Sequence, residues 1–63
     1  MDEMHPNSLA LLKLDFKAHS LGYEGDFSRD VAYKMGEEGN EYPSTDALLL
    51  AEKMIEKLKK EGD

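Results

Sequence analysis

Few side chains in this sequence could take part in catalysis, and their spacing does not bring them together. His19 is followed directly by Ser20, but neighbouring residues on a helix point about 100° apart, so no proton relay connects them. Glu37 and Glu38 lie in a polar, glycine-containing stretch that predicts a loop, and no partner for acid–base chemistry lies beside them. We therefore expect no enzymatic activity.

Metal and cofactor binding are not expected either. The chain has no cysteine, and its two histidines, His5 and His19, are isolated in the sequence. A structural zinc site needs about four converging ligands, most often thiolates and imidazoles. Without thiols the chain can form no disulfide and needs no oxidising compartment. We predict no metal site and no cofactor.

The charge balance points away from nucleic acids. Eight basic and fourteen acidic residues give a net charge of −6, and phosphates would repel this surface at long range. No apolar run approaches the roughly 20 residues of a membrane-spanning helix, and no signal segment opens the sequence. We expect an acidic domain of a cytoplasmic or nuclear protein that binds neither nucleic acid nor a membrane.

The elements that must position these residues are helical. Sixty-three residues form one domain at most, and apolar residues recur at helical spacing, with no alternation that would indicate strands. The pattern predicts helices over 8–21, 27–35 and 45–60. Gly22, Gly36 and a polar loop over 37–43 separate them. We predict a flexible N-terminus over 1–7, a compact all-α three-helix bundle over 8–60 and a tail over 61–63.

Polar residues mark the expected beginnings of these helices. Such side chains can accept hydrogen bonds from the free N–H groups of a first turn. The candidates are Asn7 or Ser8, Asp26 or Ser28, and Ser44 or Thr45. The core residues predicted from helical periodicity are Leu14, Phe16, Val31, Leu48, Ala51 and Ile55.

The first helix has two apolar stripes where a bundle usually needs one. The first stripe consists of Leu9, Leu12 and Phe16. The second lies nearly opposite and consists of Leu11, Leu14, Ala18 and Leu21. Two interpretations remain open: the other helices pack against both stripes, or one stripe contacts a partner or a second copy of the chain.

The break after the first helix carries an apolar-Gly-aromatic motif, Leu21-Gly22-Tyr23. Together with a short second helix and an amphipathic third one, this motif resembles the ubiquitin-associated (UBA) and CUE-like family. "KLDFKAHSLGY" followed by "VAYKMG" is similar to the UBA-like N-terminal domain of Regnase-type NYN endoribonucleases. "GEEGNEYPSTDALL" looks like the UBA domain of inhibitor-of-apoptosis RING ligases.

The resemblance implies a UBA-like fold and a noncatalytic module that binds ubiquitin or a ubiquitin-like protein weakly. The implied contact residues are Leu21, Gly22 and Tyr23 in the loop, with Leu49, Leu50 and Lys53 on the third helix. The Regnase-type branch implies an alternative: docking onto another domain of the same protein, or self-association, in an RNA-decay or signalling protein without ubiquitin binding. For Tyr23 itself, packing over the bundle is the alternative to recognition. The acidic stretch Glu24-Gly25-Asp26 departs from the family pattern.

Overall fold

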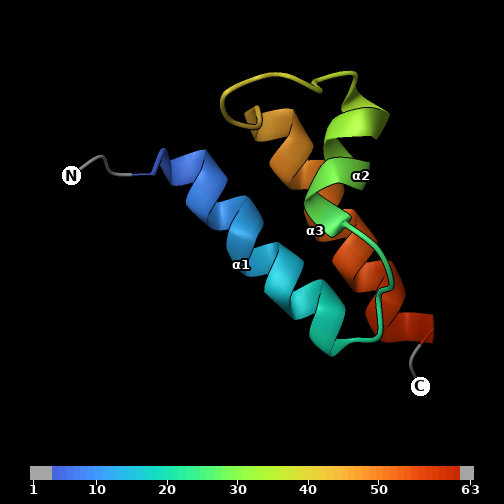
Figure 1. Cartoon of the computed structure of the whole chain (residues 1–63). Coiled ribbons are helices and arrows are strands. Elements are labelled where there is room, and N and C mark those ends of the chain that lie inside the picture. The colour runs from blue at the N-terminus through green and yellow to red at the C-terminus, as the bar shows by residue number, and fades with distance from the viewer. Residues whose placement is uncertain (1–3, 62–63) are drawn as a thin grey trace.

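A computed structural model describes residues 4–61 of the chain as three packed helices (Figure 1). Their bounds are Pro6–Ser20 for α1, Phe27–Met35 for α2 and Thr45–Glu61 for α3. No strand occurs in this described part, so the predicted all-α three-helix bundle is confirmed. Residues 1–3 of the expected flexible N-terminus and residues 62–63 of the expected tail lie outside the described residues.

The helix α1 begins earlier than predicted, because His5 and not Asn7 or Ser8 caps it. The Nδ1 atom of His5 accepts a hydrogen bond from the backbone N–H of Asn7 at 3.1 Å. Pro6 occupies the first helical position, where its missing N–H costs nothing. The Asn7 side chain instead donates to the carbonyl of Pro43 at 2.9 Å, which joins the start of α1 to the start of α3.

The other helix boundaries follow the predicted signals closely. The Asp26 carboxylate accepts from the N–H of Arg29 at the start of α2, and the Ser44 hydroxyl accepts from the N–H of Ala47 at the start of α3. Gly36 ends α2 with a φ of +68°, in the left-handed region that glycine adopts without strain.

α1 and α3 lie side by side and run in the same direction (Figure 1). Asn7 contacts Pro43 just before α3, whereas Leu14 and Lys17 line a shared surface with Ile55 and Lys59 further along α3. α2 packs against both helices and closes the bundle. The C-terminal end of α1 therefore lies near the C-terminal half of α3.

Small residues let the helices approach closely around a compact core. Ala18, Ala47 and Ala51 are fully buried, while Phe27 and Val31 are the largest side chains with no exposure. Leu11 and Ile55 complete the buried set. Close packing of this kind leaves no room for larger side chains at the alanine positions.

Three of the six predicted core residues are buried: Val31, Ala51 and Ile55. Leu14 and Leu48 are half-buried and pack against the core. The prediction that Phe16 is buried was wrong, since 66% of it is exposed. Phe16 lies about 160° around α1 from Ala18, and it is the Ala18 side of the helix that faces α2 and α3.

Candidate protein-interaction surfaces

The Leu21-Gly22-Tyr23 motif forms the end of α1. Gly22 has a φ of +98°, its N–H donates to the carbonyl of His19, and the N–H of Tyr23 donates to the carbonyl of Ala18 at 3.0 Å. In this type of glycine-capped helix end, the residue after the glycine commonly makes an apolar contact with the last helical turn. An aromatic residue at position 23 therefore has a structural reason to be there.

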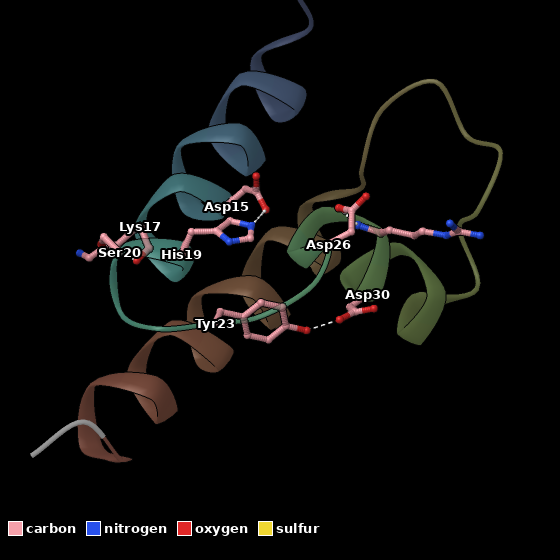
Figure 2. Close-up of polar contacts among 8 residues, drawn as sticks. Asp15, Lys17, His19, Ser20, Tyr23, Asp26 and Asp30 are labelled. Atoms are coloured by element: carbon pink, nitrogen blue, oxygen red, sulfur yellow. Dashed lines mark hydrogen bonds and ion pairs between the residues drawn. The ribbon is translucent and has the colours of Figure 1, made fainter.

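The Tyr23 side chain is half-buried and points toward Asp30 of α2 (Figure 2). Its ring meets the ring of Phe27 edge to face, with centroids 5.2 Å apart and planes at 89°. Its hydroxyl donates a hydrogen bond to the carboxylate of Asp30 in α2. This bond, followed by partial burial and the negative charge of Asp30, raises the pKa of Tyr23 to about 12. Tyr23 therefore joins the loop to α2.

The exposed edge of Tyr23 lines a shallow hollow with the C-terminal half of α3. The apolar residues beside it are Met54 and Leu58. Charged residues complete the rim: Lys34, Lys57 and Glu61. Sequence reasoning did not connect Met54 and Leu58 with Tyr23, although their spacing of four residues places them on one face of α3.

The other predicted contact residues on α3 lie elsewhere. Leu49 is 51% exposed, but it precedes Leu58 by nine residues, which places it about 180° around the helix and roughly 13 Å along it. Leu50 is half-buried against the core, and Lys53 is exposed. The structure thus brings Leu21, Gly22 and Tyr23 together and directs Leu49 away from the Tyr23 hollow.

A second apolar surface lies on α1. Leu9 and Phe16 are 44% and 66% exposed, and their spacing of two turns puts them on the same side of the helix. Leu12 lies beside them, half-buried. We call Leu9, Leu12 and Phe16 the α1 outer face. This is the first of the two predicted stripes; the second, around Leu11 and Ala18, forms the core contact.

The α1 outer face continues into a hollow of about 220 Å³ between α1, the start of α2 and the segment before α3. Most of its lining is apolar: Met4, Leu11, Leu12 and Pro43, with Ser8 and Ser28. Leu12 belongs to both surfaces and makes them continuous. A partner that covers the α1 outer face could therefore insert a side chain beside Leu12.

Positive charge borders one side of the α1 outer face. Lys13 and Lys17 are exposed on the side toward α3, and neither forms an ion pair with a carboxylate of residues 4–61. A side-chain contact with Lys59 of α3, and after it the like charge of the two groups, lowers the pKa of Lys17 below its ordinary value. In the two loops that connect the helices, by contrast, every charged residue is acidic: Glu24, Asp26, Glu37, Glu38 and Glu41.

The residues first considered for catalysis make structural contacts. The Ser20 hydroxyl donates to the carbonyl of Lys17 at 2.7 Å, while His19 lies 3.3 Å from Asp15 (Figure 2). The Glu37 carboxylate accepts hydrogen bonds from the N–H and the hydroxyl of Ser44. These two bonds lower the pKa of Glu37, the hydroxyl bond being the larger cause, and they join the end of α2 to the start of α3.

Two other classes of site are absent from the described residues. Within 4–61, no three His, Cys, Asp or Glu side chains lie close enough together to hold a metal ion. None of the helices in the same range combines the length and apolar character needed to cross a bilayer.

Fold and surfaces together define a small all-helical domain with two exposed apolar regions. No protein-family model, no curated protein and no solved structure matches the chain. The likeness to UBA domains therefore rests on the Leu21-Gly22-Tyr23 motif and the order of the helices, and membership of that family stays a prediction.

Proposed function

We propose that this domain is a noncatalytic protein-interaction module that docks through the α1 outer face. The observation that carries this proposal is the exposure of Leu9 and Phe16 on one side of α1, where neither contributes to the core. Water contact with such a continuous apolar surface is unfavourable, and a protein partner would remove it. The occupant is another protein, another domain of the same protein or a second copy.

Single exposed apolar residues elsewhere on the domain need no such explanation. Tyr33 is 71% exposed and Leu49 is 51% exposed, but each has charged residues three or four positions away on its own helix, and neither lines the hollows described above. The α1 outer face differs because it combines three apolar side chains at helical spacing with an adjoining apolar hollow. Interface residues that contribute most to binding are commonly large side chains beside such hollows.

Site-specific photocrosslinking in cells tests this proposal. A photoreactive phenylalanine analogue at position 16 should give a discrete crosslinked protein product. The same analogue in place of Tyr33, which is equally accessible on α2, should not give this product. The proposal fails if both positions crosslink to the same proteins, or if position 16 gives no product.

A second candidate is binding of ubiquitin or a ubiquitin-like protein through Leu21, Gly22 and Tyr23. Besides the resemblance, the half-exposed ring of Tyr23 beside Met54 and Leu58 supports it. The neighbouring acidic residues Glu24 and Asp26 would attract a partner whose apolar surface has a basic rim. The resemblance adds Leu49, Leu50 and Lys53 to this surface. A patch of this size should bind on the order of 100 μM.

Titration of the isotope-labelled domain with ubiquitin tests the second candidate. Tyr23→Ala should weaken binding, whereas Tyr33→Ala should leave it unchanged. Because Tyr23 packs on Phe27, circular dichroism must show that its variant keeps its helices. Met54→Asp distinguishes the two faces of α3: if it abolishes binding while Leu49→Asp does not, the contact lies in the Tyr23 hollow. No shift at millimolar ubiquitin rules this candidate out.

A further inference from the structure

We propose that an amphipathic helix from outside this domain binds the α1 outer face. This helix carries apolar residues two turns apart and acidic residues beside them. This inference rests on the proposed function, because it names the partner for the same surface. Three features of the structure carry it: the spacing of the apolar side chains, the hollow beside Leu12, and the charges along one edge.

The spacing of the apolar side chains fits a helix. Leu9 and Phe16 are seven residues apart, which corresponds to about 10.5 Å along α1. A partner helix with apolar residues at the same interval would meet both side chains from one face. Leu12 lies between them, next to the hollow that Met4, Leu11 and Pro43 line. With a volume of about 220 Å³, this hollow has room for one large apolar side chain beside Leu12.

The charges along the Lys13 and Lys17 edge favour acidic residues on the partner. Lys13 and Lys17 border the α1 outer face without a carboxylate partner among residues 4–61. Lys59 adds a third ammonium group beside Lys17, and their repulsion contributes to the lowered pKa of Lys17. Glu52 and Glu56 line the surface between α1 and α3 on which Lys17 also lies, and not the α1 outer face. Glutamates on the docked helix would neutralise the bordering lysines, whereas lysines there would be repelled.

An antiparallel pair of copies fits this surface poorly. In an antiparallel two-fold pair of α1 helices, Lys13 and Lys17 of both copies would line the same side of the contact. The apolar area is also small: the α1 outer face offers three large side chains, whereas stable interfaces bury about 800 Å² on each partner, from about 20–30 residues. A short acidic helix needs less area because it forms a weaker, transient contact.

The experiment uses two designed helical peptides with the same apolar residues at intervals of one and two turns. In one peptide glutamates flank the apolar stripe, and in the other lysines replace them. Each is titrated into the isotope-labelled domain. The glutamate peptide should shift amide signals across residues 9–17, and the lysine peptide should not. The double variant Lys13→Glu, Lys17→Glu should reverse this preference. Its control, Lys53→Glu with Lys60→Glu on the exposed side of α3, should leave the preference unchanged.

In the variant Lys13→Glu, Lys17→Glu the glutamate peptide loses two exposed ion pairs, so its binding should weaken roughly three- to tenfold. Phe16→Ser should abolish the shifts without unfolding the domain, because Phe16 lies outside the core. The inference is overturned if the glutamate peptide causes no shift on α1 or if both peptides bind equally. It is also overturned if α1 signals depend on protein concentration without peptide, which would identify a second copy. In all these cases a specific crosslink from position 16 would still uphold the proposed function, so the two can fail separately.

Discussion

The hydroxyl of Tyr23 donates a hydrogen bond to the carboxylate of Asp30, seven residues later in the first half of α2 (Figure 2). The ring of the same tyrosine packs against Phe27, at the beginning of that helix. One side chain thus connects the end of α1 with α2 across a loop of six residues, 21–26. Tyr23 therefore helps to hold α2 against the end of α1.

This bond predicts a loss of stability in alkaline solution. Asp30 holds the proton on Tyr23 and raises its pKa from 10.0 to about 12 in the folded domain. Between pH 10 and about 12, Tyr23 releases its hydroxyl proton in the unfolded chain but keeps it in the folded domain. The contribution to the free energy of unfolding is therefore complete below pH 10 and is lost as the pH rises through about 12. Urea unfolding across this range measures the effect.

Tyr23→Phe is the matched variant for this measurement. It keeps the ring on Phe27 but removes the hydroxyl, so the domain should lose about 1 kcal/mol at neutral pH. Its stability should also fall less than that of the natural chain as the pH rises above 10. Tyr33→Phe, at an exposed position, serves as control. Parallel alkaline curves for the natural chain and Tyr23→Phe would contradict the role of Asp30.

The hydrogen bonds to Glu37 predict a loss of stability in acidic solution. Hydrogen bonds from the Ser44 hydroxyl and N–H lower the pKa of Glu37 below its ordinary value of 4.5. Its contribution to stability is therefore present above pH 4.5 and is lost as the pH falls through the lowered value. Glu37→Gln should reduce this acid-dependent loss, as measured by thermal unfolding between neutral and acidic pH. Glu38→Gln, at the exposed neighbouring position, should behave like the natural chain.

The two phenylalanines should differ sharply in their effect on stability. Phe27 is fully buried whereas Phe16 is 66% exposed. Replacing Phe27 with alanine should cost about 3–5 kcal/mol, since it leaves a cavity in the core. Replacing Phe16 with alanine should change the free energy of unfolding by no more than about 0.5 kcal/mol. Chemical denaturation of both variants tests the assignment, and a large loss for Phe16→Ala would show that the α1 outer face is part of the core.

A second matched pair tests the orientation of α3. Ile55 is 4% exposed and Leu49 is 51% exposed, although both are large aliphatic residues on the same helix. Ile55→Ala should cost about 2–5 kcal/mol, enough to unfold much of so small a domain. Leu49→Ala should leave the thermal midpoint nearly unchanged. Equal effects in the two variants would mean that α3 faces the other helices differently.

The sequence by itself determined where the helices begin and end. Glycine at 22 and 36 and polar caps at Asp26 and Ser44 act on neighbouring backbone groups, and such local effects can be read along the chain. The exception also has a local cause: His5 is an unusual cap, and α1 begins at Pro6, two residues before the predicted start at Ser8. Periodicity likewise identified Val31, Ala51 and Ile55 as core residues.

Only the tertiary structure decided which stripe of α1 is core and what lies beside Tyr23. Helical spacing groups Leu9 with Phe16, and Leu11 with Ala18, but it cannot say which group meets the other helices. That choice depends on contacts between distant segments. Ala18, Ala47 and Ala51 let the helices come close, and the larger Phe16 is left outside. The same packing places Tyr23 near Met54 and not near Leu49. Which side of α3 lies beside Tyr23 depends on how α3 packs against α1 and α2, and helical spacing alone does not give that packing.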